Sequence, residues 1–314
     1  MITFDKLKIV ADIDTIEITD DELFEKVDRE GERVALQFYQ EKPFLLTIIV
    51  DYVKKEVVIE FGGKILGKDY PKLISVETIA KCFENINALG LCSIDVEAVM
   101  AAEVVIADVT KDVRGVNVPQ LTKYLRSHIS NYHLYSSRIV RGSNFEINKN
   151  VVSKRTKMRM MIYDKSREMQ TVENRRFVET NDLEHIFDDT CRFELNLKSK
   201  KQIRDALKIS NNKLKNVLAS PANPIRDFLE KVIISVDDPI DGPVVMTSKK
   251  EYLTKLVLQD CQYDLEKVEA KMRELHPNRG TNFKKLMEPY RMMMEQMKAD
   301  VTPNYFQNIL EKLG

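Results

Sequence analysis

The run Met158-Arg159-Met160-Met161-Ile162-Tyr163 alternates between two kinds of position and predicts a β-strand. Its even-numbered side chains are all apolar and would face a core, whereas Arg159, Met161 and Tyr163 would share the opposite face. A basic residue therefore lies on the same strand face as a tyrosine. We expect that face to form the floor of an open groove.

Charged residues follow this strand at once, in Asp164-Lys165-Ser166-Arg167-Glu168, and a second strand-like segment carries Arg192 and Glu194. A phenol, whose pKa is ordinarily about 10, attacks phosphorus well only when a base or a metal assists its deprotonation. Tyr163 with Glu168 and Glu194 therefore predicts a tyrosine-dependent DNA nicking site. Spacing alone favours a plainer alternative, in which two half-buried strands carry ordinary surface charges.

The order of motifs along the chain strengthens the nicking hypothesis. Four segments follow one another in a fixed order. They are a strand with an acid near its end (Val104–Asp112), a helix-like stretch (Val118–His133), a tyrosine segment (Met161–Glu168) and an Arg-Phe-Glu strand (Arg192–Glu194). A strand that ends in a glycine pair precedes them, within Val58–Gly67. This succession resembles the rolling-circle replication initiators of filamentous phages (the gene II protein family) and of small plasmids. The resemblance covers residues 45–210, about half of the chain.

The resemblance implies a role for each matching residue. Tyr163 would form a phosphotyrosyl link to the 5′ end of the nicked strand and release a 3′-OH that primes synthesis. Lys165 and Arg192 would hold the charge of the transition state. The expected cofactor is Mg²⁺ or Mn²⁺, because these hard cations prefer oxygen ligands. Three carboxylates would bind it: Asp108, Glu168 and Glu194.

One position departs from the family's pattern. The family usually has an arginine two residues before the strand aspartate, and Ile106 stands at that place here. This departure motivates a second hypothesis, a non-catalytic protein that binds a replication origin. A relaxase that starts conjugative transfer by the same chemistry is a further alternative, and the sequence does not separate it from the first hypothesis.

Charge is unevenly distributed along the chain. Over all 314 residues, Lys+Arg and Asp+Glu balance at 49 each. Residues 138–176, however, hold 11 bases and 4 acids, whereas residues 1–40 hold 5 bases and 11 acids. Because phosphate binding depends on local charge density, the neutral total does not exclude nucleic acid as a partner. The residues that we expect to contact DNA are Arg155, Lys157, Arg159, Lys200, Lys201 and Arg204.

From Lys200 onward the pattern becomes helical. Two short basic helices that meet near Ser210 are compatible with a helix-turn-helix reader. Short helices that cap a sheet have the same pattern, and we favour the cap. Three consecutive methionines, Met292 to Met294, fall in a later helix and indicate adaptable core or a partner surface rather than a cofactor site.

The expected fold class is α+β. A mainly antiparallel catalytic domain of the replication-initiator or relaxase type is predicted at residues 1–199, followed by a helical region at residues 200–314. The four cysteines have no zinc-like spacing and suit a reduced, cytoplasmic protein. No signal segment and no apolar run of about 20 residues are present, so no membrane contact is expected. The expected partners are origin DNA (single-stranded or supercoiled duplex), a host helicase or polymerase, and a second copy of the chain in a homodimer.

Overall fold

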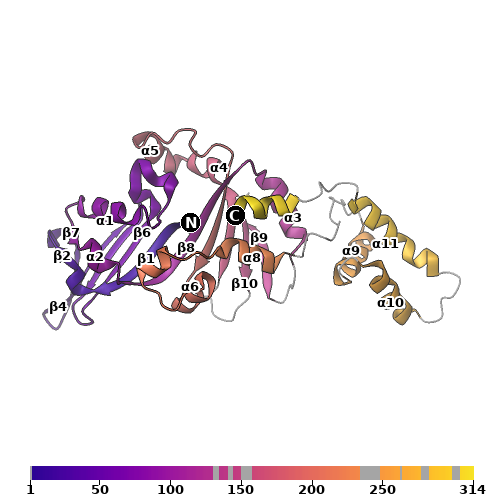
Figure 1. Cartoon of the computed structure of the whole chain (residues 1–314), viewed down its shortest axis with the longest axis horizontal. Coiled ribbons are helices and arrows are strands. Elements are labelled where there is room, and N and C mark those ends of the chain that lie inside the picture. The colour runs from indigo at the N-terminus through magenta and orange to yellow at the C-terminus, as the bar shows by residue number, and fades with distance from the viewer. Residues whose placement is uncertain are drawn as a thin grey trace. The chain divides into compact units, whose positions relative to one another are not determined.

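The computed structural model describes residues 2–129, 134–140, 144–149, 158–233, 248–261, 264–276, 283–298 and 305–314. The chain divides into two compact units (Figure 1). The sheet unit comprises residues 1–123, 131–232 and 313–314. The helical unit comprises residues 124–130 and 233–312.

A ten-stranded antiparallel sheet forms the centre of the sheet unit. In spatial order its strands are β3 (Glu25–Arg29), β4 (Glu32–Gln40), β5 (Leu46–Asp51), β6 (Glu56–Gly62), β1 (Phe4–Asp12), β8 (Glu103–Arg114), β12 (Thr190–Leu197), β11 (Arg159–Asp164), β10 (Asn144–Lys149) and β9 (Tyr135–Val140). A small second sheet pairs β2 (Ile16–Ile18) with β7 (Cys92–Ile94).

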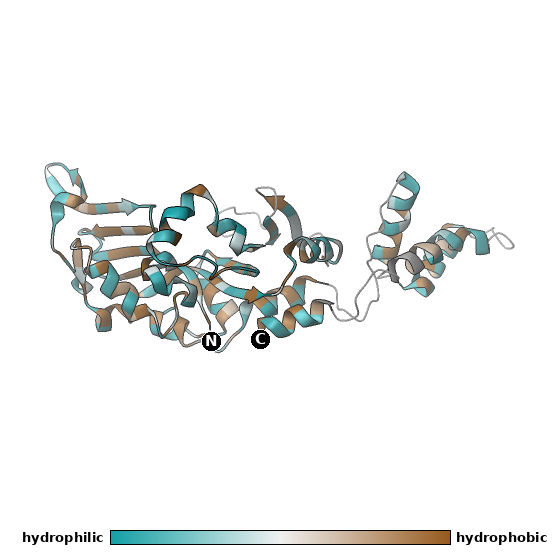
Figure 2. Cartoon of the chain, turned by 90° about the horizontal axis from the view of Figure 1, so that it is seen from above, coloured by the Kyte–Doolittle hydropathy of each residue, from teal (hydrophilic) through white to brown (hydrophobic). Residues whose placement is uncertain are grey.

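Helices in the sheet unit are short. They are the 3-10 segments η1 (Ile13–Thr15), η2 (Asp21–Leu23) and η3 (Gly63–Lys72), and the α-helices α1 (Ile79–Asn87), α2 (Val96–Val99), α4 (Lys165–Met169), α5 (Val172–Thr180), α6 (Lys200–Leu207), α7 (Leu214–Leu218) and α8 (Pro224–Val232). A further helix, α3 (Val118–Ser127), contributes residues to both units. The amphipathic helices show alternating hydrophilic and hydrophobic stripes (Figure 2).

The two faces of the sheet differ in chemistry because side chains alternate along every strand. On β12, Phe193 and Leu195 point to a fully buried apolar face, where α6, α7 and α8 pack on β8 and β12. Arg192, Glu194 and Asn196 occupy the intervening positions and therefore point to the other face. We call that second face of the sheet the polar face, and it positions the candidate site.

The helical unit has a small core of its own. Its helices are α9 (Lys249–Asp260), α10 (Leu265–Leu275), α11 (Phe283–Lys298) and α12 (Tyr305–Leu313). Leu258, Val268 and Met287 are among the buried residues that hold α9, α10 and α11 together. Met293 and Met294 join this core, as the sequence suggested, whereas Met292 is exposed.

The structure confirms the α+β class, the large antiparallel sheet and the helical C-terminal part. The compact division, however, falls after Val232 and not at residue 199, because α6, α7 and α8 pack on the sheet. None of the helices in the described ranges is long and apolar enough to span a membrane. Each of the four cysteines is buried and free of any disulfide.

Candidate functional site

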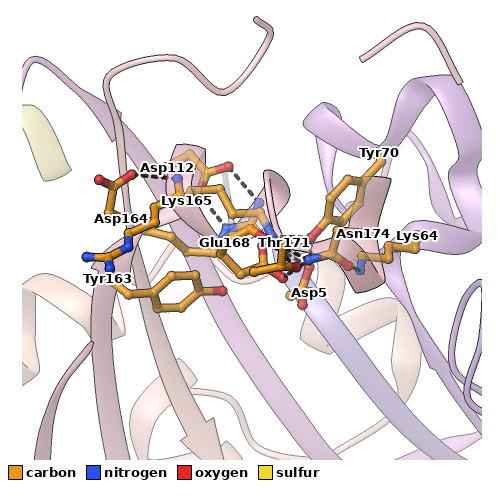
Figure 3. A network of polar contacts seen from close by, with 12 residues as sticks. Asp5, Lys64, Tyr70, Asp112, Tyr163, Asp164, Lys165, Glu168, Thr171 and Asn174 are labelled. Carbon is orange, nitrogen blue, oxygen red and sulfur yellow. Dashed lines mark hydrogen bonds and ion pairs between the residues drawn. The ribbon is translucent and has the colours of Figure 1, made fainter. Parts of the chain in front are cut away.

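The candidate site lies on the polar face where β1, β8, β12 and β11 run side by side (Figure 3). The pairing register places Tyr163 opposite Arg192 and Arg192 opposite Asp112, so three strands deliver neighbouring side chains to one spot. Segments η3, α4 and α5 supply the remaining residues. We call this group of side chains the charged cluster: Asp5, Lys64, Tyr70, Asp112, Tyr163, Lys165, Glu168, Asn174, Arg192 and Glu194.

Arg192 is the centre of the charged cluster and is completely buried, with 0% of its side chain exposed. Its Nε and Nη2 atoms donate to the two carboxylate oxygens of Asp112 at 2.6 and 2.7 Å, in a bidentate pair. Its Nη1 atom donates to Asp5 Oδ1 at 2.9 Å and to the Tyr70 hydroxyl at 2.7 Å. A buried guanidinium needs such partners, because an unpaired charge inside a protein is very costly.

Asp5 reaches the charged cluster because of an irregularity in β1. The pairing of β1 with β8 shifts register between Phe4 and Lys6, as at a β-bulge. A bulge allows two neighbouring residues to face the same side of a sheet. Asp5 can therefore contact Arg192 although Lys6, the next residue, contacts Asp108 on the same polar face.

The end of β11 places Lys165 and Glu168. Asp164 caps α4 by accepting a hydrogen bond from the backbone N–H of Arg167 at 3.0 Å, so the strand turns directly into a helix. Lys165 and Glu168 are one helical turn apart, and the Lys165 Nζ atom donates to Glu168 Oε2 at 2.5 Å. Glu168 also accepts from the Asn174 side chain, at 2.8 Å.

These contacts shift the ionisation of both residues. Burial, followed by the nearby charge of Arg192, lowers the pKa of the Lys165 ammonium. Burial alone would raise the pKa of Glu168, but the charge and hydrogen bond of Lys165 outweigh burial and lower it. Glu168 is thereby kept as a carboxylate. Asn174 links it to Lys64, whose Nζ atom donates to Asn174 Oδ1 at 2.6 Å.

Tyr163 and Glu194 form a hydrogen-bonded pair at the edge of the charged cluster. The Tyr163 hydroxyl donates to Glu194 Oε1 at 2.5 Å. Burial, followed by the charge of Glu194, raises the pKa of the phenol well above its usual range. Burial, followed by the charge of Asp5, raises the pKa of Glu194 to about 7. A carboxylate that titrates near neutral pH and touches a phenol can accept the phenol's proton when that phenol reacts.

The structure brings five of the predicted residues into one site: Tyr163, Lys165, Glu168, Arg192 and Glu194. Asp108 is not among them. It pairs with Lys6 at 3.5 Å and lies opposite Asn196 in the sheet register. Asp112, four residues further along the same strand and on the same face, contacts Arg192 in its place. The strand was predicted correctly, but a different acid on it joins the site.

The predicted metal-binding set is not assembled as a set. Asp108 faces Lys6, Glu168 faces Lys165, and Glu194 faces Tyr163, so each carboxylate has a different partner. Within the part of the chain that the structure describes, no three side chains of His, Cys, Asp or Glu are grouped so that they could hold a metal ion. The arrangement of Asp108, Glu168 and Glu194 therefore does not fit joint binding of Mg²⁺ or Mn²⁺.

The residues predicted to bind DNA are dispersed. Arg159 lies on the polar face, where it donates to Asn196 Oδ1 at 2.6 Å. On α6, Lys200 pairs with Glu103 and Arg204 donates to Asn212 Oδ1 at 3.0 Å, while Lys201 is exposed. Arg155 and Lys157 lie outside the described residues. Because the apolar side of α6 packs on the sheet, its basic residues lie toward the surface of the sheet unit.

Sequence reasoning missed several members of the charged cluster. Asp112 shares a strand face with Asp108, so periodicity could have proposed either. Lys64 lies within the stretch Val58–Gly67 that ends the strand with the glycine pair, and Tyr70 follows that stretch by three residues. No local signal marks Asp5, whose position depends on the register shift in β1.

Comparison with protein-family models, with curated proteins and with solved structures finds no match to this chain.

Proposed function

We propose that this protein initiates rolling-circle replication by nicking one strand of origin DNA, with Tyr163 as the nucleophile and Glu194 as its general base. The single observation that carries the proposal is the hydrogen bond of 2.5 Å from the Tyr163 hydroxyl to Glu194. A nucleophile within hydrogen-bond reach of a base is the arrangement that covalent catalysis requires.

The reaction follows from this pair. As the Tyr163 oxygen forms a bond to phosphorus, its proton passes to Glu194. The bond from phosphorus to the 3′ oxygen breaks, and that oxygen takes a proton from water to become a free 3′-OH. The strand's 5′ phosphate stays on Tyr163 as a phosphodiester, which preserves the energy of the broken bond for later rejoining. Because Glu194 has a pKa of about 7, it is partly unprotonated and can act as a base near neutral pH.

Two buried cations lie beside the reacting pair and support the same chemistry. The charges of Arg192 and Lys165 both favour the ionised form of Glu194. Lys165 Nζ also lies 6.0 Å from the centre of the Tyr163 ring. Fixed positive charge near a phosphate stabilises the negative charge that grows in the transition state, and it is most effective where water is excluded. In this proposal Arg192 and Lys165 act by their field, because neither is exposed enough to bind a phosphate in the described conformation.

The role of a divalent metal differs from the sequence expectation. Since Asp108, Glu168 and Glu194 have separate partners, no step of the proposed reaction passes through a metal that these three residues hold together. In this proposal Glu194 accepts the proton of Tyr163 and does not bind a metal.

Binding of DNA to the sheet unit is part of the proposal. The exposed lysines of α6 and the basic segment at residues 138–176 would contribute phosphate contacts, which position a strand without reading its sequence. Origin DNA, as a single strand or a supercoiled duplex, is the partner proposed for this surface. A host helicase or polymerase and a second copy of the chain are proposed partners of the protein without an assigned surface.

The decisive experiment is the capture of a covalent adduct. Wild-type protein is incubated with supercoiled DNA of its own replicon, and protein–DNA adducts are separated under denaturing conditions. Tyr163→Phe removes one oxygen and keeps the ring, so we expect it to bind DNA normally and to form no adduct. Tyr135→Phe is the matched control, because Tyr135 is also buried in the sheet but lies outside the charged cluster. Normal adduct formation by Tyr163→Phe would exclude Tyr163 as the nucleophile.

One observation favours a second candidate, a non-catalytic origin-binding protein. Tyr163 is only 7% exposed, and Lys165 and Arg192 are buried more completely, as in a purely structural polar core. This candidate predicts tight origin binding by wild-type protein without any adduct or nick. A relaxase would share the chemistry of the first proposal and would differ in its DNA site, at a transfer origin.

A further inference from the structure

Two cations of the charged cluster, Lys165 and Arg192, meet at one oxygen atom, the Tyr70 hydroxyl. Lys165 Nζ donates to it at 2.8 Å, and Arg192 Nη1 donates to it at 2.7 Å. The hydroxyl in turn donates to Asp5 Oδ1 at 3.0 Å. Tyr70 comes from η3, so a segment distant in the sequence connects Lys165 of α4 with Arg192 of β12.

The bonding of this hydroxyl excludes Tyr70 as a nucleophile in the described state. A phenol oxygen has two lone pairs and one hydrogen. Both lone pairs accept hydrogen bonds from the cations, and the hydrogen is given to Asp5, so no lone pair is free to attack phosphorus. The ring is also fixed, edge-on to Phe177 at 5.6 Å between ring centres and tilted against Phe187 at the same distance.

A bridging acceptor has a clear physical purpose here. Two buried positive groups repel each other, and the neighbouring charge of Arg192 adds to burial in lowering the pKa of Lys165. A neutral oxygen between them replaces the water that each would otherwise need and fixes the distance between the two nitrogens. Asp112 holds Arg192 from one side and Glu168 holds Lys165 from the other, so Tyr70 completes a continuous chain of contacts.

We propose that Tyr70 is a positioning residue of the nicking site, whose hydroxyl keeps Lys165 and Arg192 aimed at the Tyr163–Glu194 pair. This inference rests on the proposed function. Tyr70 touches none of the reacting atoms and acts through the two cations. Burial and the charge of Asp5 raise the pKa of Glu194, whereas the charges of Arg192 and Lys165 lower it. If either cation is displaced, the pKa of Glu194 therefore rises further.

Tyr70→Phe tests the inference, because it keeps the ring packing and removes only the shared acceptor. We expect the rate constant for nicking at saturating DNA to fall about tenfold or more, as when one preorganised electrostatic group is lost. The dissociation constant for DNA should stay within about twofold, since the hydroxyl is buried. The acid limb of the pH–rate profile should move to higher pH, because Glu194 must lose its proton to act as the base.

Two variants separate positioning from a general loss of structure. Phe177→Leu disturbs the packing beside the Tyr70 ring but leaves its hydroxyl in place. Tyr135→Phe removes a buried hydroxyl away from the charged cluster. Both should leave the acid limb where it is in wild type. The inference is overturned if the limb does not move in Tyr70→Phe, or if it moves equally in Phe177→Leu.

The outcome for Tyr70 is distinguishable from the outcome for the proposed function. If Tyr163→Phe forms no adduct and Tyr70→Phe nicks at the wild-type rate with the wild-type pH profile, only the positioning role is lost. If Tyr163→Phe still forms the adduct, the proposed nucleophile is wrong, whatever Tyr70→Phe does.

Discussion

Replacing Asp112 by asparagine should destabilise the sheet unit far more than the same change at Asp108. Both aspartates lie on β8 and point to the polar face, four residues apart, so they form a matched pair. Asp112 accepts two hydrogen bonds from Arg192, at 2.6 and 2.7 Å. Asp108 has one ion pair with Lys6, at 3.5 Å, and its side chain lies close to Asn196 in the register.

The loss of stability in each variant depends on how deeply the charged partner of the removed carboxylate is buried. Removing one partner of a buried ion pair costs about 3–5 kcal/mol, because the other charge stays buried. Arg192 is fully buried, which favours a large loss of stability. The Asp112 side chain is 20% exposed, however, and the amide that replaces its carboxylate still accepts one hydrogen bond. We therefore expect Asp112→Asn to lower the free energy of unfolding by about 3 kcal/mol, the lower end of that range. For Asp108→Asn we expect about 0–1 kcal/mol, because its partner Lys6 is 28% exposed and keeps a second ion pair with Glu60 at 3.4 Å. Burial also raises the pKa of Asp108, so its charge is not favoured by its surroundings.

Urea unfolding followed by far-ultraviolet circular dichroism measures both effects, and it suits a chain that has no tryptophan. With a slope of about 3 kcal/mol per molar urea, Asp112→Asn should lower the unfolding midpoint of the sheet by about 1 M. Asp108→Asn should leave it nearly unchanged. If both variants lower the unfolding midpoint by the same amount, the conclusion that Asp112 is the acid that holds Arg192 is refuted.

Three further predictions concern the reaction and the DNA. Glu194→Gln should abolish most nicking and remove the rise in rate through about pH 7 that we expect of the wild type. Excess Mg²⁺ or Mn²⁺ should not rescue it, and rescue by metal would instead identify Glu194 as a ligand. Because folding raises the Glu194 pKa from 4.5 to about 7, wild-type stability should decline as pH rises between these values, and thermal melts of Glu194→Gln should lack that decline. Removing Lys200 and Lys201 together should weaken DNA binding and flatten the log–log salt dependence by about one to two units, and an unchanged slope in fluorescence titrations would show that α6 does not face DNA.

The elements of the fold could be predicted from the sequence wherever periodicity is strong. The strand predicted at residues 158–163 is β11, Arg159–Asp164, and the strand predicted at Val104–Asp112 lies within β8, Glu103–Arg114. The alternation from Arg159 to Tyr163 also placed Arg159, Met161 and Tyr163 on one face, because a strand pairs with its neighbours in only one register when one face is buried. That face is not the floor of an open groove at Tyr163, however, because Tyr163 is buried there.

The candidate site was predictable only in part, because its composition depends on what covers the sheet. Asp108 and Asp112 have the same periodicity, and only the placement of Arg192 opposite Asp112 decides between them. Arg192 was expected to face a phosphate, yet it is buried beneath η3 residues such as Tyr70. Segment η3 contains Gly67 with a positive φ of 59°, a local conformation that no hydrophobic pattern announces.

The central position of β1 links the site to the completion of protein synthesis. Asp5 emerges from the ribosome first, yet its contact with Arg192 spans 187 residues of sequence. Until β12 is made, β8 has an unpaired edge, and the cations that would assist Tyr163 are incomplete. Contacts of such long range form late and slowly. A nascent or truncated chain that ends before residue 190 would therefore contain Tyr163 but neither Glu194 nor Arg192, so the nicking activity proposed for this protein would be confined to chains that include β12.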